Sequence, residues 1–235
     1  MTGARKYAVV FCLAILSSCA WTASCPVLAA ENQEIAKASV QQESFYDRVM
    51  EILRQSVKQD TSDFKTETPI FGAPEVTKDQ MVKYIIRHNP KPKLSVPIEE
   101  LVEYYYQEAA IEGIRPDAAV AQAILETGFF YFGGDVLPDQ NNFAGLGTIG
   151  QGVRGAYFDT ARIGVRAHIQ HLMAYATTHE PVLPIADPRY AIVKQMTSYF
   201  GQCQTWESLS GRWAVPGVNY GQRIIKIIDN VKNNR

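Results

Sequence analysis

One carboxylic acid, Glu126, combines a helix end with apolar neighbours, and this combination suits acid catalysis. Pro116 and Asp117 predict the start of the helix, because proline and an acid are favoured in a first turn, and Gly128 predicts its end. The last turn of a helix disfavours a carboxylate, and apolar neighbours withdraw water, so the protonated form of Glu126 is favoured. Such a group can donate its proton to a glycosidic oxygen as the bond breaks.

A segment rich in asparagine and glycine, residues 141–147, follows Glu126 after a short interval. With Gln122 and Glu126 it resembles the bacterial peptidoglycan glucosaminidases of glycoside hydrolase family 73, whose pattern is Gln-x-x-x-Glu-[Ser/Thr]-Gly and then Asn-Asn-Phe-x-Gly. Further segments fit the same family in the expected order: Thr68–Ile70, Gln80–Met81, Gly133–Asp135, Gly164–Leu172, Trp213–Gly217 and Asn219–Gly221. The resemblance therefore covers roughly residues 69–235.

The resemblance implies a mainly α (α+β) fold, a lysozyme-like helical domain of two lobes with a small β element. It implies that Glu126 is the catalytic acid and that Tyr220 assists it or positions the substrate. The residues that it places at the sugar subsites are Gln122, Asn141, Asn142, Phe143 and Gly145. Many members carry Tyr-Ala-Thr-Asp-Pro where this chain begins with Trp213, so the roles of that Tyr, Thr and Asp do not transfer. Trp213 is expected either to stack on a sugar or to fill the core.

A second carboxylate is harder to assign than the first. Glycosidases that use two carboxylates place them at a characteristic separation, which sequence does not supply. The candidates are Asp135, Asp139 and Asp159. Asp135 and Asp139 lie in turn-forming sequence, where an aspartate commonly serves the turn itself. An N-acetyl group on the substrate is an alternative nucleophile that would leave one essential acid.

The resulting functional hypothesis is an exported glycoside hydrolase that cleaves the β-1,4 bond after N-acetylglucosamine in the glycan strands of peptidoglycan. One alternative is a lytic transglycosylase or muramidase of the same fold, since one glutamate suffices there. The Asn-Asn-Phe-x-Gly segment favours the glucosaminidase, because transglycosylases usually carry a Gly-Leu-Met-Gln-type segment at that place. The other alternative is a non-catalytic wall-binding module, against which the presence of Glu126 and Tyr220 argues.

Composition and charge limit the other partners. The chain has 235 residues, of which 46% are hydrophobic and 20% charged, and this predicts one sizeable core. A net charge of -1 offers no basic excess for nucleic acid, so none is expected as a partner. His168 and His171 are spaced as metal ligands can be, but no third ligand stands at a telling distance. We therefore expect no metal and no cofactor, and we expect both histidines to form hydrogen bonds to neighbouring elements.

The first thirty residues predict an export signal, so the site of action is expected outside the cytoplasm. Arg5 and Lys6 precede an apolar run, and small residues precede Glu31, which is typical of signal cleavage. A lipoprotein signal with acylated Cys19 is the alternative, and it would attach the protein to the cell envelope. Cleavage near residue 30 leaves Cys203 as the sole thiol, expected to be buried and free.

Residues that typically start or end helices divide the remaining chain into elements. Residues 31–68 are expected to form a helical arm and linker, too short in apolar pattern for a coiled coil, so we expect a monomer. The catalytic domain, residues 69–235, is expected to hold helices at 77–87, 97–112, 115–128, 162–178 and 187–201 and a last one after Asn219. A short, glycine-rich hairpin is expected within residues 147–158.

Overall fold

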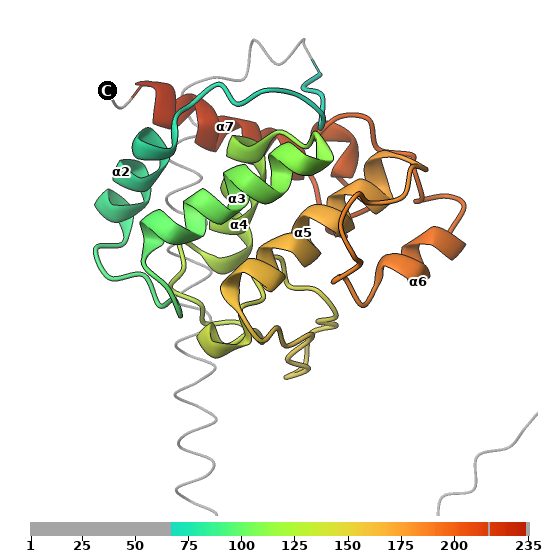
Figure 1. Ribbon diagram of the computed structural model, residues 1–235, viewed down its shortest axis with the longest axis horizontal. Helices are drawn as coiled ribbons and strands as arrows, with labels where there is room; N and C mark the ends of the chain where they lie inside the picture. The colour runs from blue at the N-terminus through green and yellow to red at the C-terminus, as the bar shows by residue number, and fades with distance from the viewer. Residues whose placement is uncertain (1–66, 216, 234–235) are drawn as a thin grey trace, which may run out of the picture. The chain divides into compact units, whose positions relative to one another are not determined.

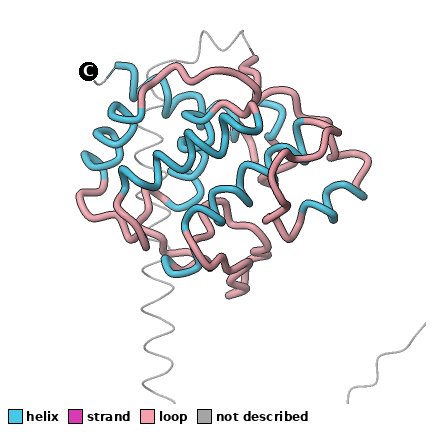
Figure 2. Tube along the Cα trace, in the orientation of Figure 1, coloured by secondary structure: helices cyan, strands magenta, loops and turns pink. Residues whose placement is uncertain are grey.

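The computed structural model describes residues 67–215 and 217–233. They form six α-helices and two short 3-10 helices joined by loops (Figures 1 and 2). The order is α2 (Lys78–His88), α3 (Ile98–Glu112), α4 (Pro116–Thr127), η1 (Pro138–Gln140), α5 (Ala161–Ala176), α6 (Tyr190–Gln195), η2 (Glu207–Leu209) and α7 (Tyr220–Asn233). The expected signal peptide and nearly all of the expected N-terminal arm lie outside the described residues. The mainly helical, lysozyme-like fold class is confirmed.

Several helix ends lie where their capping residues predict. Thr77 caps α2 through a side-chain hydrogen bond to the backbone of Gln80, whose own side chain returns the bond to Thr77. Gly113 ends α3 in the left-handed conformation, with φ of 75°. Gly128 does the same for α4, with φ of 56°, which fixes Glu126 in the last turn of that helix.

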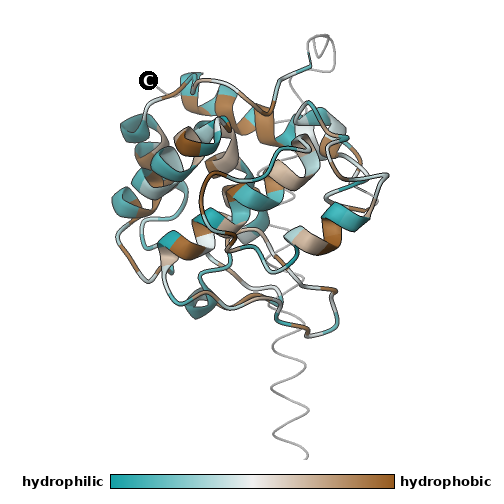
Figure 3. Cartoon of the chain, turned by 45° about the vertical axis from the view of Figure 1, so that its right-hand side comes forward, coloured by the Kyte–Doolittle hydropathy of each residue, from teal (hydrophilic) through white to brown (hydrophobic). Residues whose placement is uncertain are grey.

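Helix α4 is the central element of the described domain. All nine of its residues from Pro116 to Ile124 are buried. It packs against α3 on one side and α7 on another, while α5 packs along α3 (Figure 1). Helix α5 is also buried over most of its length, whereas the remaining helices mix hydrophobic and hydrophilic residues along their length, as Figure 3 shows, and turn one face to the core. The site at the end of α4 is therefore held by a helix with core contacts around its whole circumference.

The β component is smaller than expected. Within residues 67–215 and 217–233 there is no strand, and the only β pairings are three isolated bridges, at Pro69 with Thr205, Phe71 with Ile114, and Ser210 with Ala214. The hairpin expected within residues 147–158 is wrong, because this segment turns at residues 150–152 and is otherwise irregular, with no strand. Side-chain amides of Gln140 and Asn142 take up the carbonyl groups of Arg154 and Ala156 that a strand partner would otherwise bind.

Helix α6 is also shorter than the expected span of residues 187–201. The chain leaves the helix at Met196 and is drawn back to the end of α5 by two backbone bonds. The Gly201 N–H donates to the Ala174 carbonyl at 2.9 Å, and the Cys203 N–H donates to the Tyr175 carbonyl at 2.7 Å. Cys203 is buried and free, as expected. No helix in the described part of the chain has the length and apolar character needed to cross a bilayer.

Candidate active site

Glu126 is the penultimate residue of α4, and its partly buried side chain is held by two aromatic residues. Its Oε1 atom accepts a hydrogen bond from the indole Nε1 of Trp213 at 3.1 Å and another from the hydroxyl of Tyr220. Tyr220 begins α7, and Trp213 lies in the loop before it. Two donors on one oxygen fix the orientation of the carboxyl group.

The environment raises the pKa of Glu126 above that of an ordinary glutamate. The main cause is burial, which penalises the carboxylate, while the hydrogen bonds from Tyr220 and Trp213 and the charge of Arg223 act in the opposite direction. Burial also raises the pKa of Tyr220 well above that of a free tyrosine, so its hydroxyl keeps its proton. The site therefore favours a protonated Glu126 beside neutral donors, as acid catalysis requires.

A surface depression adjoins the second oxygen of Glu126. Its walls are formed by Glu126, Thr127, Phe132, Gly134, Asp135, Val136, Gly145 and Thr148. Gly145 has φ of +64°, and a Cβ added to it would lie 3.8 Å from Glu126 Oε2. The backbone at Gly145 therefore borders Oε2 closely, and Oε2 faces the depression while Oε1 faces the two aromatic donors.

Of the three candidates for a second carboxylate, only Asp135 lines this depression. Its Oδ1 atom accepts a hydrogen bond from the Gly152 N–H at 3.0 Å, which holds it partly buried. Asp139 and Asp159 are exposed and do not contribute to the walls around Glu126. Its position therefore favours Asp135 over Asp139 and Asp159 as the second carboxylate.

The residues 141–143 turn their side chains into the protein. The Asn141 amide donates to the Phe158 carbonyl at 2.9 Å, and its oxygen accepts from the Ser95 hydroxyl. Asn142 donates to the Leu146 carbonyl and accepts from the Leu146 N–H, both at 2.9 Å. Phe143 is buried against the rings of Tyr105 and Phe130. These side chains shape the loop, which presents Gly145 to the depression; direct contact of the three with sugar remains a prediction.

A close backbone approach ties this loop to α5. A Cβ placed on Gly164, in the first turn of α5, would lie 1.8 Å from the carbonyl oxygen of Asn141, closer than any side chain permits. Only glycine fits at this contact, so the loop and the first turn of α5 depend on each other for their positions.

A line of buried polar side chains leads away from Tyr220. Gln122 Nε2 donates to the Tyr220 hydroxyl oxygen at 2.8 Å, and Gln122 Oε1 lies 2.9 Å from His168 Nε2. His168 Nδ1 lies 2.8 Å from the hydroxyl of Tyr105 on α3. Gln122, His168 and Tyr105 are each fully buried. Gln122 was expected at a sugar subsite, and here its side chain is bonded within the protein.

The sequence alone did not single out Tyr105, because it lies 63 positions from His168 and no pattern joins the two residues. The expectation that both histidines form hydrogen bonds to neighbouring elements is met. His171 Nδ1 lies 2.8 Å from Asp187 Oδ2, and its ring packs edge-on against Trp213 with centroids 4.9 Å apart. Trp213 thus neither lies bare on the surface nor fills the deep core; its partly buried indole connects α5 to Glu126.

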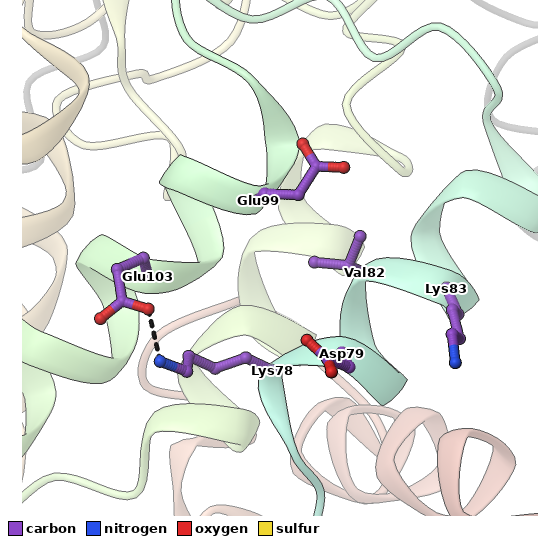
Figure 4. A pocket seen from close by; sticks show the side chains of 6 residues that line it. All are labelled: Lys78, Asp79, Val82, Lys83, Glu99 and Glu103. Carbon is purple, nitrogen blue, oxygen red and sulfur yellow. Dashed lines mark hydrogen bonds and ion pairs between the residues drawn. The ribbon is translucent and has the colours of Figure 1, made fainter.

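A second depression lies between α2 and α3, away from this chemistry. Lys78, Asp79, Val82, Lys83, Glu99 and Glu103 line it, and Figure 4 shows the ion pair that joins Lys78 to Glu103. Neither Glu126 nor any of its partners contributes to it. Among the described residues there is also no cluster of three or more His, Cys, Asp and Glu side chains arranged to hold a metal ion.

Comparison with known proteins places this geometry in a family. The sequence profile described as mannosyl-glycoprotein endo-beta-N-acetylglucosaminidase matches residues 102–233, more than half of the chain. An uncharacterized protein of Borreliella burgdorferi is 34% identical over 150 residues, which are 64% of this chain and 70% of that protein. No solved structure matches the chain significantly. The matched range contains Glu126, Trp213 and Tyr220, and the chain therefore belongs to the glucosaminidase family of glycoside hydrolases.

Proposed function

We propose that this protein hydrolyses the β-1,4 bond that follows N-acetylglucosamine in peptidoglycan glycan strands, with Glu126 as the general acid. The observation that carries the proposal is a glutamate of raised pKa whose Oε1 is occupied by two donors and whose Oε2 faces an open depression. A proton on Oε2 is then directed toward a bound substrate. The peptidoglycan substrate is supported by the glucosaminidase family match.

In the proposed reaction, the bond between the anomeric carbon and the glycosidic oxygen breaks as the Glu126 proton passes to that oxygen. Water then adds to the anomeric carbon, and its proton returns to the Glu126 carboxylate. Asp135, which lines the depression, is the proposed carboxylate that stabilises positive charge at the anomeric carbon; if it instead activates the water, it takes the water's proton in place of Glu126. The N-acetyl group of the substrate is the alternative nucleophile.

Three substitutions test the assignment of the acid. Glu126→Gln keeps the size and the acceptor for both aromatic donors but has no acid proton, so we expect it to be inactive on purified peptidoglycan. Asp135→Asn is expected to be partly active, and Asp139→Asn, an exposed acid outside the depression, is the matched control and is expected to be fully active. Full activity of Glu126→Gln would exclude Glu126 as the acid.

Mass spectrometry of the soluble products tests the bond. Reducing N-acetylglucosamine ends support the proposal. Anhydromuramic ends would instead show a lytic transglycosylase, reducing muramic ends a muramidase, and the absence of soluble products a wall-binding module. These outcomes are mutually exclusive for a single purified protein.

We further propose that the protein acts outside the cytoplasm, because residues 1–30 have the pattern of a signal peptide. Metabolic labelling with a palmitate analogue separates the two export routes. Label on the mature protein would establish acylation of Cys19, whereas an unlabelled protein beginning near Glu31 would establish simple cleavage.

A further inference from the structure

The buried line of Tyr105, His168, Gln122 and Tyr220 ends on the proposed acid, and the direction of its hydrogen bonds depends on which ring nitrogen of His168 carries the proton. A neutral His168 and the Gln122 amide each have one nitrogen or oxygen atom that donates and another that accepts, so the direction of one hydrogen bond determines the direction of the next. The question is which end sets the direction. The answer lies in the hydroxyl of Tyr105, at the end remote from Glu126.

The Tyr105 hydroxyl has one hydrogen-bond partner among the described residues, and that partner is His168 Nδ1 at 2.8 Å. Tyr105 is fully buried, so a hydroxyl proton pointing elsewhere would remain unsatisfied away from water, which is costly. Tyr105 therefore donates, and His168 Nδ1 accepts. An imidazole that accepts at Nδ1 carries its proton at Nε2.

The next two bonds follow from that tautomer. His168 Nε2–H needs an acceptor, and Gln122 supplies its carbonyl oxygen at 2.9 Å. The Gln122 amide nitrogen then points to the Tyr220 oxygen at 2.8 Å. Because Tyr220 already accepts this bond, its own O–H is directed to Glu126 Oε1.

We propose that Tyr105 and His168 are positioning residues for Glu126: they fix the direction of the Tyr220 hydrogen bond and so reserve Glu126 Oε2 for the catalytic proton. Oε1 receives donors from Tyr220 and Trp213 at once, and an oxygen that accepts two such bonds is a poor place for a proton. The positioning role rests on the proposed function, because it assumes that Glu126 is the acid. The His168 tautomer that the proposal requires does not depend on catalysis.

The groups around the line are consistent with a neutral His168. Burial, and to a smaller extent the neighbouring His171, lowers the pKa of His168 to about 3. The Trp213 ring, with a centroid 5.7 Å from that of His168, adds no charge. Around Glu126 the ionisable groups are Tyr220 and Arg223 of α7 and Asp135 across the depression.

Removal of the Tyr105 hydroxyl allows the line to reverse. His168 is then free to carry its proton at Nδ1, the Gln122 amide can turn its nitrogen to His168 Nε2, and Tyr220 can donate to the Gln122 oxygen instead of Glu126. Glu126 loses a donor that favours its carboxylate, so its pKa rises. This effect reaches Glu126 from a residue that does not touch it.

The first test compares Tyr105→Phe with Tyr106→Phe. The two residues are neighbours on α3 and each loses one hydroxyl donor, but that of Tyr106 is bonded to the Val76 carbonyl at 2.6 Å and has no part in the line. We expect Tyr105→Phe to raise the Glu126 titration midpoint, read by carbon NMR of labelled glutamate, by part of the roughly 1 pH unit that complete loss of the Tyr220 bond would give, in proportion to the reversed population. The alkaline limb of the kcat/KM profile should move by the same amount, and Tyr106→Phe should move neither.

The second test reads the histidine directly. Nitrogen NMR of labelled histidine in the wild-type protein should show His168 protonated at Nε2 and unprotonated at Nδ1, and in Tyr105→Phe a population protonated at Nδ1 should appear. A wild-type His168 protonated at Nδ1, or an unchanged Glu126 midpoint in Tyr105→Phe, would overturn the proposal. If Tyr105→Phe does not fold, the wild-type tautomer still decides. Both NMR readouts hold for a protein inactive on peptidoglycan, so failure of the proposed function is distinguishable from failure of this inference.

Discussion

Replacement of Tyr220 by phenylalanine tests the electrostatics of the site most directly. The hydroxyl makes two buried bonds, one donated to Glu126 Oε1 and one accepted from Gln122 Nε2. The bond to Glu126 favours its carboxylate, whereas burial disfavours it. With the hydroxyl removed, burial acts with less opposition, and the pKa of Glu126 rises further above that of an ordinary glutamate.

The size of the change follows from the bonds lost. A hydrogen bond to a charged acceptor contributes about 1.5–3 kcal/mol, and one pKa unit corresponds to about 1.4 kcal/mol. Trp213 still donates to Oε1 and the carboxyl is only partly buried, so the low end applies, a rise of about 1 unit. Gln122 Nε2 loses its acceptor in the fully buried interior, which should lower the free energy of unfolding by about 1–3 kcal/mol.

The assay is the release of reducing ends from purified peptidoglycan as a function of pH. Since the acid must be protonated to act, the alkaline limb of kcat/KM reports its pKa and should move to higher pH in Tyr220→Phe. Tyr190→Phe is the control, because Tyr190 is also buried but its hydroxyl donates to the His179 carbonyl and makes no bond to Glu126, Gln122 or Trp213. An alkaline limb that stays in place or moves to lower pH in Tyr220→Phe would refute the reasoning.

Three further expectations concern stability. The folded protein holds the Glu126 proton at pH values where the unfolded chain has released it. The free energy of unfolding of the wild type should therefore fall relative to that of Glu126→Gln as the pH rises through the glutamate range. Urea unfolding of both proteins at several pH values measures this difference. His168 has the opposite effect. Its pKa is about 3 in the folded protein, so as the pH falls the unfolded chain takes up the proton before the folded protein does. Between pH 6.5 and 5 this should lower the free energy of unfolding by about 2 kcal/mol, and a folded His168→Gln protein should not show this loss. Gly164→Ala should lower the free energy of unfolding by about 3 kcal/mol or more, because the added Cβ clashes with the Asn141 carbonyl. Gly134→Ala is the control: its Cβ would meet nothing within 4 Å, and it should lower the free energy of unfolding by less than about 1 kcal/mol. Thermal melting of both variants measures the difference.

Local signals in the sequence predicted the helix that carries the acid. Pro116 and Gly128 act within a few residues of themselves, one by its fixed φ and the other by its tolerance of positive φ, so their effects can be read from the chain alone. The same holds for the capping box at Thr77. Glu126 was placed at the helix end for this reason.

Long-range contacts could not be predicted in the same way. The partner of Glu126 at Trp213 lies 87 positions away, and Gln122 meets Tyr220 across 98. The irregular course of residues 153–158 is fixed by side-chain amides of Gln140 and Asn142, which bind the carbonyl groups of that segment, and a glycine-rich sequence does not reveal these bonds. Family resemblance brought Tyr220 into the prediction, and no pattern in the sequence pointed to Tyr105.

The carboxamide of Gln122 prevents proton transfer along the buried line of side chains. A hydroxyl or an imidazole can take up a proton on one side and release another, but an amide that accepts at Oε1 and donates from Nε2 does not exchange them between these atoms. Gln122 therefore insulates Glu126 from the interior, and the indole of Trp213, which only donates, closes the other side. Among the described residues the route left to Glu126 is the depression, so in the proposed reaction the proton that reloads the acid comes from the water that adds to the anomeric carbon there.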